Sequence, residues 1–436
     1  MTLIALPILA FGAALLVTLR SLGGGLICVI TIGYFHGYIR ANYLSVYTTF
    51  LFDAAILGLY LGFVLGHSAR VGQLSRWALS GWVGLLLLWP GMLVFVPVND
   101  FLVQLVALRA TVWFVPVLLV ASQLTAAELV QLARALAVLN LLALGGGLYV
   151  YYAGVEALYP FNAVTQIIYI SRDVGSAGYH RVPSFFLSAH AYGGTMLWTL
   201  PLLVERTFGV GVRWGERLLA ASGLFAAVVG ILLCGARQPA ALALLMLPAA
   251  WGLARFHAGV GLLAVGLAGL GLILLEQSER FQRAKELLDT EQVERRVRLS
   301  ANESFLELLL RYPAGAGLGS AYGTSIPYFL ADRAPQAIGL ENEFSRLLVD
   351  QGWLGVGLWL GFLLWLLGRP PPLRLEASFG LAVVFMHALA LVSWATAFIG
   401  TGLLSSVPGS VLMLAQMGVL ARVREVQTAW RNRPAG

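Results

Sequence analysis

The chain is poor in charge. Asp, Glu, Lys and Arg together make up 11% of its 436 residues, whereas an ordinary soluble domain carries about 25%. Hydrophobic residues make up 59% of the chain, and the mean hydropathy is +0.82. Because so few charges cannot cover the surface of a soluble fold of this length, the composition indicates a membrane protein.

Cysteine and lysine are also scarce. The two cysteines, Cys28 and Cys234, both lie within apolar segments, so we expect neither a disulfide framework nor a thiolate metal site. The sequence has no metal-ligand spacing, no Walker motif and no dinucleotide fingerprint. We therefore expect no metal and no cofactor. The net charge of +7 comes almost entirely from arginine, since Lys285 is the sole lysine.

Long apolar stretches fill most of the sequence. A helix that crosses a bilayer needs about 20 apolar residues, and the first stretch lacks the basic start of a cleavable signal peptide, so we expect it to be a retained helix. The fold class that follows is an all-α, polytopic transmembrane helical bundle of about 12 to 13 spans. The candidate spans lie near 2 to 19, 22 to 38, 47 to 65, 79 to 97, 102 to 121, 129 to 153, 185 to 204, 217 to 235, 238 to 254, 258 to 276, 351 to 368, 378 to 397 and 402 to 421.

Two connections, 154–184 and 277–350, are much longer than a turn between helices, and they divide the chain. The second connection is expected to contain a short helix: Ser300 and Glu303 form a capping box before the apolar run at 305 to 310, and the turn at 312 to 315 ends the helix. We expect the active side of the bundle to carry both connections. The regions are N-terminal transmembrane helices in 1–153, a loop in 154–184, central transmembrane helices in 185–276, a large helical loop in 277–350, and C-terminal transmembrane helices with a tail in 351–436.

Arginine placement predicts the orientation. Short loops on the cytoplasmic side of a membrane protein are rich in arginine and lysine. One side of the alternation of spans holds most of the arginines, so this side is predicted to be cytoplasmic, and both long loops periplasmic. With thirteen spans, the N-terminus is then outside as well. The arginines are Arg70, Arg76, Arg206, Arg213, Arg217, Arg255, Arg369, Arg374, Arg422, Arg424, Arg431 and Arg433.

Two arginines lie at the opposite, outer boundary. Arg181 precedes the span near 185 to 204, and Arg237 occupies a very short turn between two spans. A single interfacial arginine is usually explained by snorkelling to headgroups or by a carboxylate partner. Two together favour another explanation, because a guanidinium stays charged and binds phosphate with a planar fork of donors. They predict a site for a lipid diphosphate.

The large loop holds further candidates. Arg298 and Arg311 are basic residues that could bind a diphosphate or a glycan, although Arg295 and Arg296 compete with Arg298 and nearby acidic residues make a solvated helix face an alternative. His190, close in sequence to Arg181, is a candidate for substrate binding or proton transfer, with a packing role as the alternative.

Acidic residues close the large loop. Glu341, Asn342 and Glu343 stand just before the span near 351 to 368. A carboxylate near the membrane surface could act as a general base for a sugar hydroxyl, while a helix N-terminus also favours acidic residues. Within the spans, Asp53 and Arg109 are costly in lipid unless they are paired or face water, so a structural ion pair and a proton path are both open.

Four stretches read together resemble the O-antigen polymerase and O-antigen ligase superfamily of membrane glycosyltransferases. The order and spacing fit across about residues 160 to 420. The stretches are Arg181-Val182-Pro183-Ser184-Phe185-Phe186, Gly235-Ala236-Arg237-Gln238-Pro239, Arg311-Tyr312-Pro313-Ala314-Gly315-Ala316-Gly317-Leu318-Gly319, and Glu341-Asn342-Glu343-Phe344 leading into Gly352-Trp353-Leu354-Gly355.

The resemblance implies a function and its partners. Members act in the bacterial inner membrane, with the active face periplasmic, and transfer sugar with inversion from a polyprenyl (undecaprenyl) diphosphate carrier without a required metal. Arg181 and Arg237 match the family's two boundary arginines, and Arg298, with Arg295 and Arg296 as competing assignments, matches an arginine before the Pro-Gly turn. The implied partners are the lipid-linked glycan, an acceptor glycan or glycolipid, membrane lipids and a chain-length regulator protein, with no nucleic acid.

One difference from the family's pattern favours a polymerase over a ligase. Ligases that transfer glycan to lipid A core show a histidine where this chain has Glu341. The resemblance therefore favours a polymerase of O-antigen or exopolysaccharide repeat units, with a ligase or a protein O-oligosaccharyltransferase as alternatives. A transporter or flippase of lipid-linked glycans is the rival from another class, but the sequence shows no clear repeat. A non-catalytic membrane subunit is the third alternative.

Overall fold

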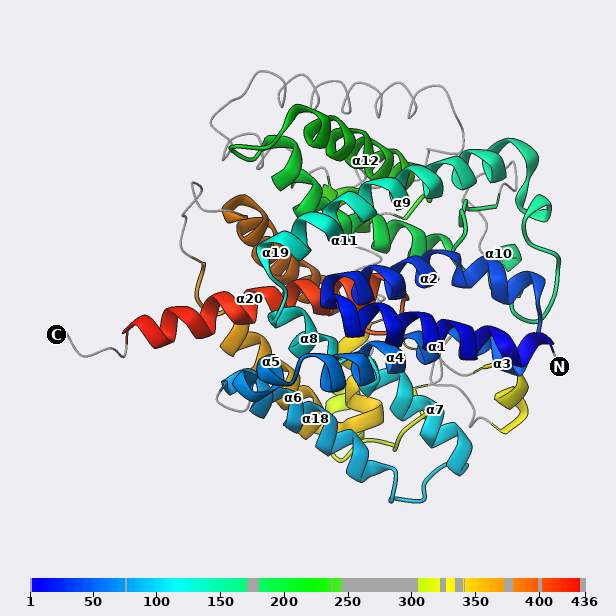
Figure 1. Cartoon of the computed structure of the whole chain (residues 1–436). Helices are drawn as coiled ribbons and strands as arrows, with labels where there is room; N and C mark the ends of the chain where they lie inside the picture. The colour runs from blue at the N-terminus through cyan, green and yellow to red at the C-terminus, as the bar shows by residue number, and fades with distance from the viewer. Residues whose placement is uncertain are drawn as a thin grey trace, which may run out of the picture.

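The structure is a computed structural model. It describes residues 2–74, 77–170, 180–236, 238–243, 246, 305–321, 327–333, 340, 342–371, 379–398 and 402–431. Within these ranges every regular element is a helix, and the helices form one bundle (Figure 1). The predicted all-helical fold is confirmed.

Most helices follow the predicted apolar stretches, because a chain in lipid must satisfy its backbone hydrogen bonds internally. The first half of the bundle contains α1 Thr2–Arg20, α2 Leu22–Asn42, α3 Val46–Thr49, α4 Leu51–Gly66, α5 Ser68–Leu74, α6 Ala78–Leu93, α7 Phe101–Val112, α8 Val117–Ser122, α9 Ala126–Ala153, η1 Val155–Ala157 and α10 Gln166–Ile170. The second half contains α11 Ala189–Phe208, α12 Trp214–Leu233, α17 Phe305–Arg311, η3 Tyr328–Arg333, α18 Glu343–Leu367, α19 Gly380–Ala395, η4 Thr396–Phe398 and α20 Gly409–Arg431.

Several helices are long and apolar enough to cross a membrane. Seven described segments meet this condition, and α4 with α5 adds an eighth if that pair, bent by 95°, is one span. The chain is therefore a multi-pass membrane protein. The candidate spans near 238 to 254 and 258 to 276 lie outside the described residues except for 238–243 and 246.

Two central helices, α11 and α20, are long but are not among the seven. Both are largely buried: α11 packs against α9, α12, α19 and α20, and residues 409–421 of α20 have no exposed side chain. Figure 1 shows α11 inside the bundle, whereas α20 begins inside it and projects from it at its C-terminal end. Because their neighbours shield them from lipid, these helices do not need strongly apolar surfaces.

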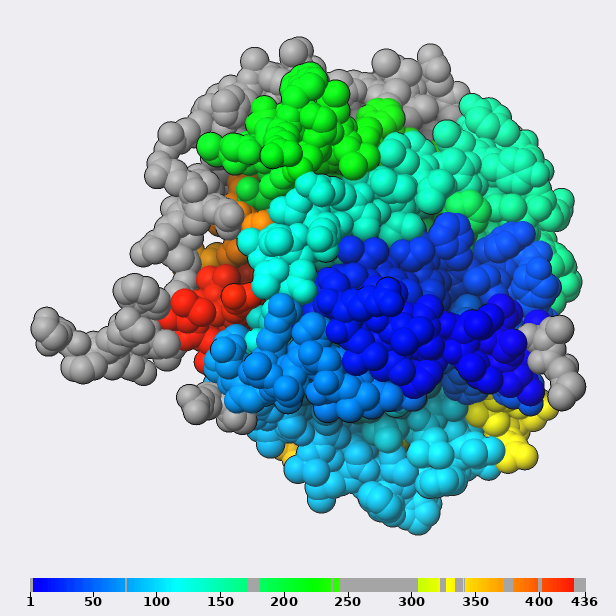
Figure 2. Space-filling view, viewed as in Figure 1, coloured from blue at the N-terminus to red at the C-terminus, as the bar shows by residue number. Residues whose placement is uncertain are grey.

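The first helix, α1, lies at the periphery. Only 17% of its most apolar window is buried, and it covers the near face in Figure 2. It packs closely on α4, where a Cβ added at Gly58 would lie 2.3 Å from the Phe11 carbonyl oxygen. Gly62 and Gly66 follow at four-residue intervals and also face α1, an arrangement that lets two membrane helices approach. Both α1 and α2 are long and apolar enough to cross a membrane.

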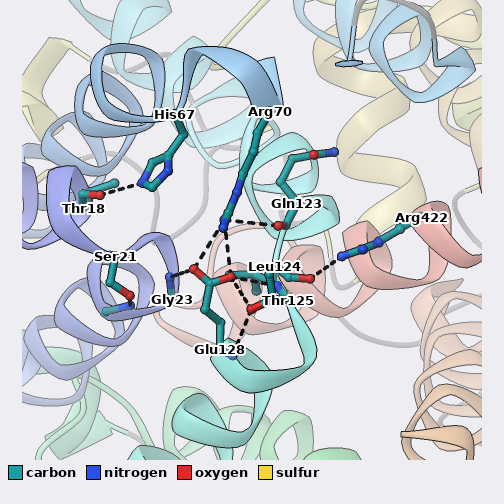
Figure 3. Close-up of polar contacts among 11 residues, drawn as sticks. Thr18, Ser21, Gly23, His67, Arg70, Gln123, Leu124, Thr125, Glu128 and Arg422 are labelled. Carbon is teal, nitrogen blue, oxygen red and sulfur yellow. Dashed lines mark hydrogen bonds and ion pairs between the residues drawn. The ribbon is translucent and has the colours of Figure 1, made fainter. Parts of the chain in front are cut away.

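One end of the bundle, here called the arginine-rich end, gathers arginines from distant parts of the sequence. Arg70 donates to the carboxylate of Glu128 at 3.3 Å, and the same carboxylate accepts the N–H of Gly23 at 3.2 Å. Arg422 donates to the carbonyl of Leu124, so α20 joins this network (Figure 3). The predicted clustering of Arg70 and Arg422 on one side is therefore observed. The opposite end, here called the loop end, carries α3 and α10 (Figure 1).

Two predicted boundaries were wrong. The segment from Ser184 to Ser188 is not helical, because Ser184 has φ 53° and Ser188 caps α11 by accepting the N–H of Ala191 at 3.1 Å. The predicted span at 102 to 121 agrees with the candidate span Phe101–Ser122, within which a turn that includes Pro116 separates α7 from α8. The predicted span at 402 to 421 begins as a loop and becomes helical only at Gly409.

Candidate functional site

Arg181 and His190 form a contact at the loop end. Arg181 Nη1 lies 2.8 Å from His190 Nε2, and His190 is in the first turn of α11. Both residues were candidates from the sequence, and the structure brings them together.

A network of backbone contacts fixes the segment that follows Arg181. The Tyr159 hydroxyl donates to the carbonyls of Ser184 at 2.6 Å and Phe186 at 2.9 Å. Ser184 Oγ donates to the Ala143 carbonyl in α9, and the Tyr38 N–H in α2 donates to the Phe185 carbonyl at 2.9 Å. The segment is therefore held between α2 and α9, which gives Arg181 a rigid base.

Arg237 lies outside the described residues, but its neighbours do not. A Cβ added at Gly193 in α11 would lie 2.5 Å from Cys234 Sγ and 3.5 Å from Ala236 Cβ and Pro239 Cγ. The turn that carries Arg237 thus packs on α11 one helical turn from His190. Gln238 Nε2 donates to Thr396 Oγ1 at 2.7 Å, which connects this turn to η4.

Glu343 is buried and its carboxylate is fully engaged. One oxygen accepts from Arg346, and the other accepts the N–H of Gly402 at 2.7 Å and of Leu403 at 3.2 Å. Arg346 is 8% exposed and donates also to Ser405 Oγ at 3.1 Å. Glu343 therefore joins α18 to the loop before α20, a contact the sequence did not reveal.

The other sequence candidates are dispersed. Asn342, which is 1% exposed, caps α18 by accepting the N–H of Ser345 at 2.6 Å. Arg311 is exposed at the end of α17, with its guanidinium 5.5 Å from the Tyr312 ring centroid. Arg298 and Glu341 lie outside the described residues, as does the capping box at Ser300.

The glycine-rich turn after α17 locks onto a kink in α18. Gly352 has φ 68° within α18, and Trp353 N–H donates to the Pro313 carbonyl at 3.0 Å. Gly315 also has a positive φ, 83°, and its added Cβ would lie 2.8 Å from the Gly352 nitrogen. The buried Asp350 accepts the N–H of Ala321 at 3.0 Å. These contacts position the loop end of α18, where Glu343 and Arg346 lie.

Substituting Gly352 by alanine is expected to destabilise the protein. A Cβ there would lie 2.6 Å from the Ala314 carbonyl carbon, and the positive φ alone costs an alanine about 1–3 kcal/mol. Thermal unfolding in detergent measures the loss. Gly357→Ala in the same helix is the control, because its added Cβ meets nothing within 4 Å. Equal melting temperatures for both variants would contradict the expectation.

A second group of charges at the loop end includes residues that the sequence analysis missed. Arg109 binds Asp53 with two hydrogen bonds, Nε to Oδ1 at 2.7 Å and Nη2 to Oδ2 at 2.8 Å. The sequence left open whether Asp53 and Arg109 form a structural ion pair or a proton path, and the structure shows the ion pair. Arg40 lies close by in the last turn of α2. It was overlooked because the candidate span ended at residue 38, whereas α2 extends to Asn42. The signal that identified Arg181, an arginine where the positive-inside rule does not expect one, could have identified Arg40 as well.

Among the described residues, no group of three His, Cys, Asp or Glu side chains is placed to hold a metal ion. Comparisons with protein-family models, with curated proteins and with solved structures found no match to this chain.

Proposed function

We propose that the protein is an inverting membrane glycosyltransferase, which transfers a glycan from a polyprenyl diphosphate carrier to an acceptor sugar hydroxyl at the periplasmic face of the bacterial inner membrane. Polymerisation of O-antigen or exopolysaccharide repeat units is the favoured reaction. The observation that supports it most is the convergence of Arg181, His190 and the turn that carries Arg237 on the first two turns of α11.

The diphosphate needs cations at headgroup depth. Arg181 touches His190 and precedes a segment that is hydrogen-bonded to α2, and the Arg237 turn lies beside the same helix as His190. Guanidinium groups bind phosphate oxygens bidentately and remain charged at all working pH values. Two of them would stabilise the negative charge that gathers on the departing diphosphate.

The reaction is a single displacement. The acceptor hydroxyl oxygen bonds to the anomeric carbon while the bond from that carbon to the diphosphate oxygen breaks. The hydroxyl proton passes to a base, and the carrier diphosphate leaves with the electron pair of the broken bond. Placing the acceptor opposite the leaving group inverts the anomeric centre.

The base is assigned to Glu341. Both oxygens of Glu343 already accept hydrogen bonds from Arg346 and from two backbone N–H groups, so its carboxylate is not free to take a proton from an acceptor. Glu341 stands two residues earlier and matches the position at which the ligases of the family carry a histidine. In this proposal Glu343 is a positioning residue.

Purified protein incubated with a lipid-linked repeat unit tests the proposal. A ladder of products on a gel is expected for a polymerase, and a single product formed only with added lipid A core would assign a ligase instead. Reconstituted vesicles provide the comparison with the rival class. Movement of the lipid-linked glycan across the bilayer without any new glycosidic bond would contradict the transferase proposal and support a flippase.

A further inference from the structure

A group of polar side chains at the loop end is not used by the proposed reaction. It consists of His36 and Arg40 in α2, Asp53 in α4, Arg109 in α7 and Tyr328 in η3, and is called here the outer basic cluster. Arg109 and Asp53 are bound to each other by two hydrogen bonds. Arg40 lies near Arg109, Asp53 and Tyr328, and His36 lies near Arg40 and Arg109.

The outer basic cluster is separate from the Arg181 segment. The face of α2 that carries Gly37 and Tyr38 packs on Phe185 and Leu187. His36 faces α4 instead, with its ring centroid 6.0 Å from that of Phe52.

The cluster has more donors than acceptors. Both carboxylate oxygens of Asp53 accept from Arg109, so the one carboxylate in the cluster is paired with Arg109 and not with Arg40. In the part of the chain that the structure describes, the buried Arg40 Nε has no hydrogen-bond partner, nor does His36 Nε2. Backbone groups of Thr48 and Thr49 lie near the His36 ring, but none meets Nε2 with hydrogen-bonding geometry.

Such an arrangement is costly without a ligand. His36 is 3% exposed, and burying an uncompensated charge or an unsatisfied donor costs several kcal/mol. Arg346, which is 8% exposed, shows how this protein satisfies a buried arginine elsewhere, because it pairs with Glu343. Arg40 has none within ion-pair distance among the described residues, so an external oxyanion would complete the cluster.

We propose that the outer basic cluster binds a phosphate ester that carries a free hydroxyl group. Arg40 donates from Nε and from its terminal nitrogens to the phosphate oxygens, and the Arg109 charge adds to the attraction. The hydroxyl group forms a hydrogen bond with His36 Nε2 in either tautomer of the ring, since a hydroxyl both donates and accepts. Asp53 holds Arg109 in place. A glycerophospholipid headgroup and a soluble sugar phosphate share this chemistry.

Binding to the purified full-length protein tests the proposal. Isothermal titration calorimetry in non-ionic detergent measures glycerol 3-phosphate, with glycerol as the uncharged probe, and native mass spectrometry measures retained phosphatidylglycerol against phosphatidylcholine. We expect a phosphate-bearing probe with hydroxyls to bind. Retention of phosphatidylglycerol alone assigns a lipid headgroup, and binding of glycerol 3-phosphate assigns a soluble phosphate ester. Failure of both overturns the proposal.

Arg40→Gln separates a ligand site from a structural arginine. We expect it to weaken phosphate binding at least about tenfold, the effect of a lost hydrogen bond to a charged group. The matched control is Arg333→Gln in η3, whose side chain is 58% exposed; it should bind as the wild type does.

Stability provides the second measurement. Without phosphate, Arg40→Gln should melt no lower than the wild type, since it removes a partly buried cation whose Nε has no hydrogen-bond partner, and added phosphate should stabilise only the wild type. An Arg40→Gln variant that fails to fold, or that binds as tightly as Arg333→Gln, would show that Arg40 is a structural residue.

His36→Gln should also weaken phosphate binding while retaining the fold, and unchanged binding would show that His36 is not part of the site. Neither result bears on glycan transfer, so this proposal can fail independently of the proposed function.

Discussion

Replacing Arg181 by alanine is expected to lower the rate of chain extension by about 10²–10³, the usual effect of removing one well-placed group that stabilises developing charge. The segment that follows Arg181 is held between α2 and α9 by contacts that do not involve the guanidinium, so the substitution should remove the cation and leave these contacts in place. Arg237→Ala should have a similar effect. Turnover of a lipid-linked repeat unit by purified variants measures both.

The controls for this prediction distinguish a lost cation from lost structure. Arg181→Lys keeps the charge but loses the planar fork of donors, so an intermediate rate is expected. Arg333→Ala removes an arginine at the same end whose ion pair with Asp100 is long, 3.7 Å, and largely exposed, and its rate should match the wild type. Wild-type polymer from both Arg181→Ala and Arg237→Ala would refute the proposed diphosphate site.

The fold was predictable from the sequence because lipid imposes a simple rule. Apolar stretches of about 20 residues must become helices, since no water is present to satisfy the backbone. The ends of the helices were less predictable, because tertiary contacts decide them. Ser184 takes a positive φ where Tyr159 and Ala143 hold its segment, and Gly352 bends α18 where the Pro313 turn packs.

The candidate site was predictable only in part. Arg181 was identified because the sequence predicts it at the outer boundary, where the positive-inside rule does not expect an arginine. Arg40 gives the same signal once α2 extends to Asn42. The partners of Glu343 could not be inferred, because Gly402 and Leu403 are 59 and 60 residues away in the sequence. Sequence spacing reports neighbours on one helix, whereas this carboxylate is defined by contacts between two segments.

Glu343→Gln is expected to destabilise the protein by about 3–5 kcal/mol, the range measured when one partner of a buried ion pair is removed. Glutamine has nearly the same shape, so the loss comes from leaving the charge of Arg346, which is 8% exposed, without its carboxylate. Unfolding in detergent, followed by heat or denaturant, measures this change. Arg346→Gln should be destabilising for the complementary reason.

The double variant Glu343→Gln with Arg346→Gln decides between a structural and a catalytic role. No uncompensated charge remains in it, so it should recover most of the stability that either single variant loses. If Glu343 only positions the loop at 402 to 405, transfer activity should recover together with stability. A catalytic base gives the opposite pattern: Glu343→Gln would abolish transfer in a protein of normal stability, and the second substitution would restore nothing. Because the carboxylate already has three donors, we expect the first pattern, which would agree with the proposed base at Glu341.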